Sequence, residues 1–132
     1  MSLLKPGLVG KAELIVDEEH TAKSVGSGMI GVLATPVMIN LIEAAALQAI
    51  EAHLPDRCQS LGTYLEVSHV AATPVGMRVS AIAELVKVEG RLLEFRARAI
   101  DEVEEIGAGT HRRIVVNVDK FVSRVARKTP AK

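Results

Sequence analysis

The longest apolar stretch of the chain, Pro36 to Leu54, constrains the fold more than any other part of the sequence. It is helix-like in composition. Thr35 followed by Pro36 predicts the start of the helix, because threonine can cap free backbone amides and proline fits the first helical position. Pro55 then ends the helix. A helix this apolar has to be covered over much of its surface by other elements.

Segments with β-rich or alternating character flank this helix and are separated by turn residues. One precedes it and four follow it: Gly7–Val16, Ser60–Ala71, Met77–Glu89, Arg91–Asp101 and Thr110–Val118. One strand, one long helix and four further strands is the order of an α+β domain in which an antiparallel sheet curls around the helix. The pair Glu89-Gly90 predicts a tight hairpin between two of these strands.

Three other segments match neither a strand nor a long helix. Asp17–Gly31 is rich in charged residues, serine and glycine, which predicts a mobile connection and a candidate lid. Gly107–Gly109 is expected either as a bulge or as the turn between the last two strands. Phe121–Lys132 is basic and contains no acidic residue, so it is expected to be a solvated tail, with phosphate binding as the alternative.

Size and charge exclude several classes of protein. At 132 residues the chain is expected to form one domain, residues 1–132, with one core. Its 16 basic and 16 acidic residues give no net charge, which argues against binding to nucleic acid or to an anionic membrane. The N-terminal segment lacks the features of a signal peptide and no apolar run approaches about 20 residues, so a cytoplasmic location is expected.

Aromatic residues are scarce, since Tyr64, Phe95 and Phe121 are the only three. The core must therefore be filled by Val, Leu, Ile, Ala and Met. Side chains this small leave room for a pocket only if a partner closes it. We therefore expect a homodimer or a higher homo-oligomer.

Glu43 places a carboxylate on the predicted helix, away from its polar side. At about 100° per residue, Asn40, Gln48 and Glu51 fall together on that polar side, whereas residue 43 falls among apolar positions. A carboxylate shielded from water is costly unless it is paired or hydrogen-bonded, so such positions are enriched at sites of chemistry. The alternative is a side chain that reaches solvent along its own stem.

His69 lies on the predicted strand Ser60–Ala71, and a period of two places it on the face toward the helix. The other residues expected on that face are Leu61, Thr63, Leu65 and Val67. Histidine exchanges protons near neutral pH, and a carboxylate shielded from water is a stronger base. Glu43 and His69 are therefore expected to meet in one apolar layer, although a hydrogen-bonded core histidine is the alternative.

Three further residues are candidates from the residues alone. The Thr35 hydroxyl stands about 12 Å from Glu43 along the helix axis and acts either as a cap or in catalysis. Gly62 either lets a ligand approach the backbone or relieves crowding in a curved strand. Arg113 shares a strand face with His111, and an arginine there could bind phosphate or carboxylate or stay exposed.

The sequence contains no set of metal ligands at a familiar spacing. The four histidines lie on four separate predicted elements, and there is no phosphate-binding glycine motif. No metal and no bound cofactor are expected.

Motifs spread over nearly the whole chain beyond the first strand resemble those of one family. They are Ala34-Thr-Pro36 with Glu43, Ser60-Leu-Gly-Thr63, Val67–Gly76, Val88-Glu-Gly-Arg91, Glu105–His111 and Lys120-Phe121. The runs His-Val-Ala-Ala-Thr-Pro-Val-Gly and Glu-Ile-Gly-Ala-Gly-Thr-His are the most specific. In these motifs the chain resembles the fluoroacetyl-CoA thioesterase-like family of the hot-dog superfamily.

This resemblance implies a hot-dog fold, with a five-stranded antiparallel sheet wrapped around one long central helix and paired across a dimer. It also implies hydrolysis of acyl-CoA by a threonine, a glutamate and a histidine, which correspond to Thr35, Glu43 and His69. Gly62 and Arg113 match the family's substrate-contacting residues, although Arg112 is adjacent. Glu43 would activate water or attack the thioester itself.

One segment departs from the family pattern. Members specialised for fluoroacetyl-CoA carry aromatic residues before the catalytic threonine, whereas Thr21–Ala34 has none. The expected substrate is therefore a short or medium acyl-CoA without a fluoroacetyl preference. A non-catalytic module that binds acyl-CoA or a small ligand on the same fold is the alternative, and a hydratase is a third reading that no sequence feature favours.

Overall fold

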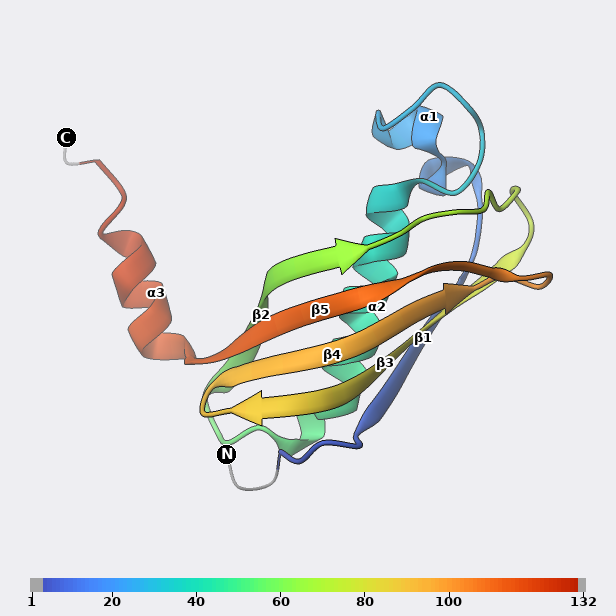
Figure 1. Ribbon diagram of the computed structural model, residues 1–132. Coiled ribbons are helices and arrows are strands. Elements are labelled where there is room, and N and C mark those ends of the chain that lie inside the picture. Colours follow the sequence, from blue (N-terminus) through green and yellow to red (C-terminus); the bar gives the residue numbers. More distant parts are fainter. Residues whose placement is uncertain (1–3, 131–132) are drawn as a thin grey trace.

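The computed structural model describes residues 4–130 and consists of one long helix held against one curved sheet (Figure 1). The helix, α2 (Thr35–Ile50), continues as a short 3-10 turn, η2 (Glu51–His53), so that helical structure ends just before Pro55 as predicted. None of the helices in residues 4–130 is long and apolar enough to span a lipid bilayer.

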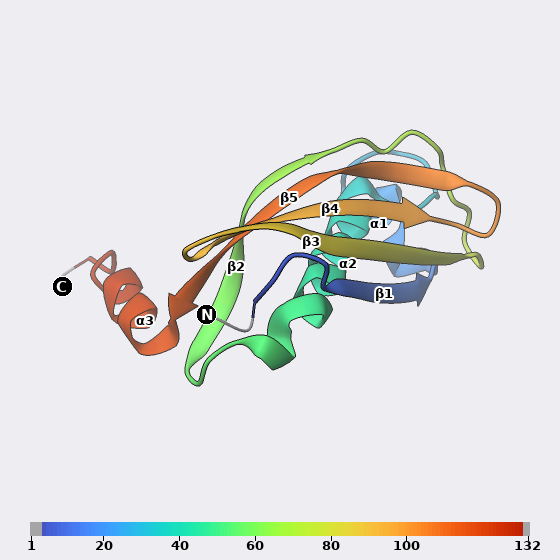
Figure 2. The ribbon, with the colours of Figure 1, turned by 60° about the horizontal axis from the view of Figure 1, so that its bottom comes forward.

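The sheet has five antiparallel strands in the order β1-β3-β4-β5-β2. They are β1 (Val9–Ile15), β2 (Cys58–Val67), β3 (Arg78–Glu89), β4 (Leu92–Ile100) and β5 (Glu105–Asn117). Figure 2 shows the sheet curving over α2, with β1 and β2 at its two edges. The α+β prediction of one strand, one helix and four strands is confirmed.

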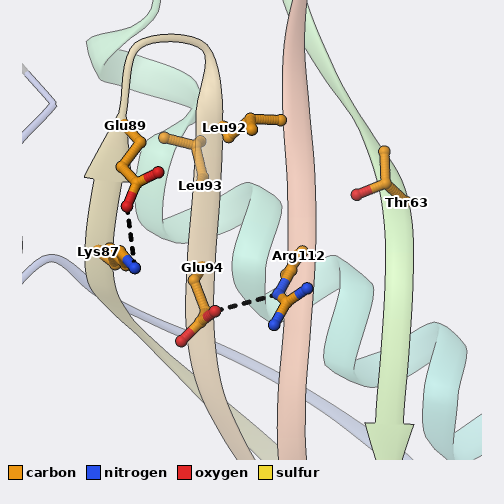
Figure 3. Close-up of a pocket in the computed structure, with 7 residues that line it drawn as sticks. All are labelled: Thr63, Lys87, Glu89, Leu92, Leu93, Glu94 and Arg112. Atoms are coloured by element: carbon orange, nitrogen blue, oxygen red, sulfur yellow. Dashed lines mark hydrogen bonds and ion pairs between the residues drawn. The ribbon is translucent and has the colours of Figure 1, made fainter.

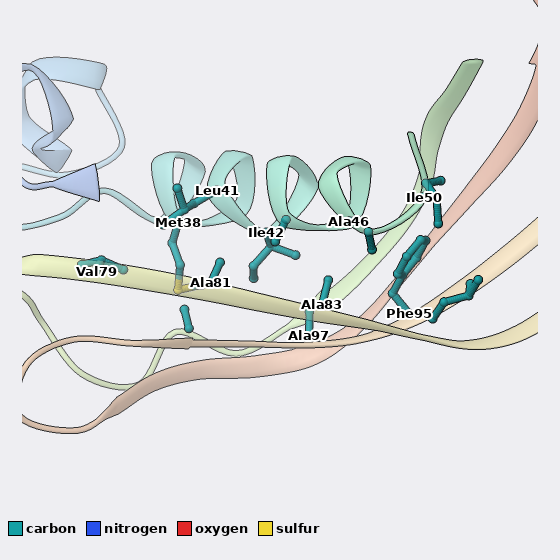
Figure 4. Close-up of a cluster of buried hydrophobic side chains, with 14 of the residues drawn as sticks. Met38, Leu41, Ile42, Ala46, Ile50, Val79, Ala81, Ala83, Phe95 and Ala97 are labelled. Atoms are coloured by element: carbon teal, nitrogen blue, oxygen red, sulfur yellow. The ribbon is translucent and has the colours of Figure 1, made fainter. Parts of the chain in front are cut away.

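Small side chains on the sheet let α2 approach closely. Figure 4 shows Ala81, Ala83 and Ala97 on the side of the sheet that faces α2, opposite helix residues such as Ile42. Ala99, which pairs with Ala81, is also fully buried. Gly10 on β1 is the extreme case, because a Cβ there would lie 2.0 Å from the backbone oxygen of Ala45. The core is thus aliphatic around Phe95, as the scarcity of aromatic residues predicted.

Strand β2 differs from its prediction in length and in register. It ends at Val67, so His69 lies in the connection that follows and not on the strand. Its pairing with β5 is shifted between Gly62 and Tyr64, which makes Thr63 an extra residue. The predicted face was therefore wrong in part, because the bulge reverses the alternation: Ser60 and Gly62 face inward before it, and Leu65 does so after it.

The glycines between residues 107 and 109 lie inside β5 and are not a turn. The turn between β4 and β5 is formed by residues 101–104 instead. Side chains at Gly107 and Gly109 would collide with the backbone of Ser68 and Glu66, so these glycines let the chain pass close beside β5. A register irregularity does fall next to them, at Ile106.

The connection between β1 and α2 contains more regular structure than its composition predicted. In what we call the lid segment, residues 17–34, η1 (Glu18–His20) and the short helix α1 (Ala22–Val25) follow one another. Backbone hydrogen bonds join Ala22 to Val32 at 2.8 Å and Leu33 to Thr73 at 2.9 Å. The first bond closes the lid segment on itself, and the second attaches it to the connection between β2 and β3.

The basic end of the chain is solvated as predicted, but residues 121–126 of it are helical. Helix α3 (Val118–Ala126) starts at Asn117, whose side chain caps it, and none of its residues is buried. Figure 1 shows α3 projecting past the end of the sheet, away from α2. Its side chains are therefore at least partly exposed in the part of the chain that the structure describes.

Candidate functional site

The hydroxyl of Thr35 binds a histidine and does not cap the helix. The N-cap of α2 is Ala34, which makes no side-chain capping bond, and Thr35 is the first helical residue. Its Oγ1 lies 2.7 Å from Nδ1 of His69. The prediction that Thr35 caps the helix was wrong. The helix starts one residue earlier than expected, so Pro36 is its second residue and not its first. The hydroxyl is thereby free for the histidine.

His69 has one satisfied ring nitrogen and one unsatisfied one. Its Nε2 is buried and has no hydrogen-bond partner within residues 4–130. Burial lowers the pKa of His69 below its ordinary value of 6.5, because the charged form loses hydration. A hollow of about 220 Å³ is lined by residues 69–72. A neutral imidazole can accept or donate a proton.

Glu43 is half-buried on the flank of α2, as its helical position predicted, with 34% of its side chain exposed. Its Oε2 lies 3.4 Å from Nη1 of Arg113, which comes from β5 on the opposite side of the layer. The carboxylate that the sequence singled out therefore has a cationic partner. An ion pair of this kind offsets much of the cost of removing the carboxylate from water.

Arg113 is almost fully buried and its donors are directed by the sheet. Its Nε donates to Ser60 Oγ at 2.8 Å and its Nη2 donates to the Ser60 carbonyl at 2.9 Å. Burial lowers the pKa of Arg113, yet an arginine keeps its proton at any physiological pH. The adjacent Arg112 points to the other face, where it pairs with Glu94 at 3.0 Å. Only Arg113 can therefore reach Glu43.

His111 belongs to the same cluster, although the sequence did not predict a role for it. Its Nδ1 lies 3.0 Å from the carbonyl oxygen of Tyr64, which can only accept, so Nδ1 carries the proton. The Nε2 atom is then the acceptor for Nη1 of Arg113, at 3.1 Å. Burial lowers the pKa of His111, and the charge of Arg113 acts in the same direction. The shared strand face of His111 and Arg113 was the one signal of this contact in the sequence.

Gly62 faces the carboxylate of Glu43 across the layer. A Cβ at this position would lie 2.5 Å from Glu43 Oε2 and 3.1 Å from Cε1 of His111. The glycine is thus required for the close approach of β2 to the cluster. Of the two sequence interpretations, this contact supports relief of crowding.

The predicted meeting of Glu43 and His69 does not take the form of a direct contact. Within residues 4–130, no hydrogen bond or ion pair joins these two side chains. The structure instead forms two pairs on α2, Thr35 with His69 and Glu43 with Arg113. The pairs start from helix positions eight residues apart, about 12 Å along the axis.

A separate hollow on the outer face of the sheet is not part of this arrangement. It has a volume of about 270 Å³ and contains the ion pairs Lys87–Glu89, at 2.9 Å, and Glu94–Arg112, at 3.0 Å (Figure 3). It faces away from α2 (Figure 3). Its charged groups are already paired with each other, so it offers no free group for catalysis.

Comparison with known proteins places this arrangement in a family. The family model described as "FlK: Fluoroacetyl-CoA-specific thioesterase" matches residues 16–119. A fluoroacetyl-CoA thioesterase of Streptantibioticus cattleyicolor is 48% identical over 100 residues, which cover 76% of this chain and 72% of the relative. The chain belongs to the FlK thioesterase family.

Solved structures of FlK superimpose closely on the structure of this chain. One, reported for the activity and substrate specificity of FlK, has a TM-score of 0.90 with 38% identity and covers 96% of this chain and 98% of its own. An FlK variant in complex with fluoroacetate and CoA has a TM-score of 0.84 with 37% identity and covers 89% and 99% of the two chains. The hot-dog fold and the thioesterase class that the motifs predicted are therefore confirmed.

The family match includes every predicted site residue of this FlK homologue. Residues 16–119 contain Thr35, Glu43, Gly62, His69 and Arg113, together with the lid segment. The match ends just inside α3. The family model thus covers all the predicted site residues and only the first two residues of α3, whereas the FlK structure covers 96% of the chain.

Proposed function

We propose that this chain hydrolyses acyl-CoA thioesters to a free acid and CoA, with Glu43, His69 and Thr35 as catalytic residues. The observation that carries the proposal is the carboxylate of Glu43, held at one oxygen by Arg113 and facing the side-chain-free surface of Gly62. Oε2 is anchored and Oε1 remains available to the reacting atoms. A positioned carboxylate with one free oxygen is what general-base catalysis requires.

In the proposed reaction Glu43 takes a proton from a water molecule as the water oxygen attacks the thioester carbonyl. The tetrahedral intermediate then collapses, the carbon–sulfur bond breaks, and the proton passes to the CoA sulfur. The backbone amide of Gly62 is a candidate donor to the oxyanion. Direct attack by Glu43 is the rival mechanism, and it would leave an acyl-enzyme that rapid quenching and mass spectrometry detect.

Thr35 and His69 form the second part of the proposed site. Their 2.7 Å contact sets the orientation of the imidazole and leaves Nε2 without a hydrogen-bond partner among residues 4–130. We assign the missing partner of Nε2 to the substrate or to the reacting water. His69 would exchange the proton with it, and Thr35 would hold His69 in place and stabilise the reacting group.

The expected contact between Arg113 and CoA is revised in this proposal. The Arg113 side chain is only 4% exposed and its donors are occupied by Ser60, His111 and Glu43. It therefore acts on the substrate through Glu43, as a positioning residue. Gly62 retains its proposed contact with the acyl group.

The proposed acyl group is short or medium in length and need not carry fluorine. The lid segment contains none of Phe, Tyr and Trp, and its large exposed apolar side chains are Val25, Met29 and Ile30. A panel of acyl-CoAs that includes acetyl-CoA and fluoroacetyl-CoA tests this directly. A strong preference for the fluorinated substrate would contradict it.

We also propose a homodimer formed through β2. This strand is an edge of the sheet, so one row of its backbone hydrogen-bonding groups is unpaired. Leu61, Tyr64 and Leu65 are all substantially exposed on it. Antiparallel pairing of two β2 strands would satisfy the backbone and cover these side chains. Sedimentation or light scattering measures the mass, and a monomer at all concentrations would contradict the proposal.

Release of CoA thiol from acyl-CoA, followed with a thiol reagent, is the central test of the function. The wild-type chain is expected to turn over at least one acyl-CoA, and Glu43→Ala is expected to abolish turnover. Binding of acyl-CoA without release of thiol would instead identify a non-catalytic binding module.

A further inference from the structure

Helix α3 carries two surfaces that no part of residues 4–130 buries. Helical spacing puts Phe121, Val122 and Val125 on one side, and Val122 and Val125 are 59% and 50% exposed. Lys120 and Arg124 lie with Arg127 on another side. Exposed apolar side chains of this kind on a projecting helix are an interaction surface.

A complementary surface lies at the other end of the chain, on the lid segment. Met29 is 84% exposed and Ile30 is 69% exposed, and Val70 from the neighbouring connection is also exposed. Three exposed acidic residues, Asp17, Glu18 and Glu19, start the segment, whereas Lys23 is its only lysine or arginine. The lid segment thus offers apolar and acidic groups where α3 offers apolar and basic ones.

The two surfaces stand at opposite ends of β2. Val118, the first residue of α3, donates its backbone N–H to Arg57 just before β2 begins, at 2.8 Å. The lid segment is bonded to Thr73 in the connection that follows the end of β2. Figure 1 shows the same arrangement, with α3 beyond one end of β2 and α1 beyond the other.

Two-fold pairing of β2 strands brings these ends together. In an antiparallel pair the start of one strand lies beside the end of the other, and two-fold symmetry repeats the contact on both sides. The ten residues of β2 span about 33 Å, so each α3 would stand at its partner's lid segment and not at its own.

We infer that α3 of one protomer packs on the lid segment of its partner, with Val122 and Val125 against Met29 and Ile30 and the basic side toward residues 17–19. The inference rests on the β2 dimer proposed above and deepens it. The partner helix then closes the end of α2 where Thr35 and His69 meet, so each site is completed by the other chain.

Cross-linking between two differently tagged chains tests this contact. One chain carries Val122→Cys and the other Met29→Cys, both with Cys58→Ser, and the two are co-expressed as the full-length protein. Oxidation is expected to give a covalent heterodimer. The matched control replaces the first change with Val9→Cys, an exposed valine on the opposite edge strand β1, and is expected to give none.

A second variant keeps the test informative if cysteines perturb the dimer. Val122→Glu with Val125→Glu is expected to lower kcat/KM by roughly tenfold while the protein stays dimeric, whereas Val9→Glu leaves both unchanged. A dimer with no specific cross-link and full activity in the double variant would overturn the α3 contact alone. A wild-type protein that is monomeric would overturn both this contact and the β2 dimer. A wild-type protein without thioesterase activity would overturn only the proposed reaction.

Binding to vesicles tests the other partner that a basic amphipathic helix can have. Wild-type protein is expected to stay in the supernatant with vesicles of phosphatidylcholine and phosphatidylserine. The inference would be overturned, and α3 assigned to an anionic membrane, by three results together. The wild-type protein would sediment with the vesicles, the double variant would not, and the cross-link would not form.

Discussion

The two pairs of side chains on α2 differ in how completely the single chain satisfies them. Glu43 is held by Arg113, which is buried in the sheet and bound in turn to Ser60 and His111. His69 is held only by Thr35 and keeps a buried ring nitrogen without a partner among the described residues. The pair of Glu43 and Arg113 is positioned by the packing of α2 on the sheet. The pair of Thr35 and His69 lies where α2 meets a connection and has an unsatisfied hydrogen-bonding group.

This difference predicts separate consequences for stability and for catalysis. A buried charge whose partner is removed costs several kcal/mol, whereas a half-exposed side chain in a connection contributes little to folding. Changes around Arg113 should therefore lower both stability and activity, and changes at His69 should lower activity alone. The predictions below test this separation, beginning with the largest effect.

Replacing the carboxylate itself should cause the largest loss of activity. Glu43→Gln retains the shape and a hydrogen bond to Arg113 but cannot accept a proton, so kcat should fall by about 10³-fold or more. Release of CoA thiol measures this, and circular dichroism confirms the fold. Turnover within twofold of the wild type would remove Glu43 from the mechanism.

Removing the guanidinium should cause the largest loss of stability. Arg113→Met leaves Ser60 and His111 without their buried partner, and the free energy of unfolding should fall by about 3 kcal/mol. Arg112→Met is the matched control, because the Arg112 side chain is 53% exposed and pairs with Glu94 at the surface, where the cost should stay below about 1 kcal/mol. Equal losses in urea unfolding of the two variants would refute the comparison.

A change at His69 should affect catalysis without affecting stability. His69→Gln should reduce kcat by about 10²-fold while the free energy of unfolding stays within about 0.5 kcal/mol of the wild type. The control, His53→Gln, changes the histidine of η2 and should alter neither quantity. A marked fall in melting temperature for His69→Gln would show that this region is structural.

A methyl group at Gly62 should perturb the first pair only locally. The new Cβ would contact the end of the Glu43 side chain, which can shift, so Gly62→Ala should fold and lose roughly tenfold in kcat. Gly31→Ala meets no atom within 4 Å and serves as the control. Full activity in Gly62→Ala would show that the position of the carboxylate is not critical.

The smallest predicted effect is the pH dependence of stability. Burial holds the pKa of His111 below its ordinary value of 6.5, so the unfolded chain binds more protons once the pH falls below that value. The contribution of His111 to the free energy of unfolding should therefore be constant well above pH 6.5 and decrease as the pH falls from there toward the lowered pKa of the folded state. His111→Gln should flatten this slope in urea unfolding measured between pH 5 and 7. An unchanged slope would assign it to other groups.

The main elements and the half-buried position of Glu43 could be read from local patterns. A long apolar run with a proline at its start is expected to form a buried helix. The alternating strands around it then bury their apolar face against that helix. The same periodicity placed Glu43 on the flank of α2, where the structure has it. These features depend on neighbours within a few residues, which a sequence shows directly.

The composition of the two pairs was decided only by tertiary structure. One extra residue at Thr63 reverses the alternation of β2, and the early end of that strand places His69 beside Thr35. A bulge that depends on pairing with β5 leaves no local pattern in the sequence. The sequence therefore could not show that Glu43 contacts Arg113 and not His69. The sequence by itself determined which side chains were available for chemistry, and the packing of distant strands on α2 determined which of them meet, because contact depends on register between segments far apart in the chain.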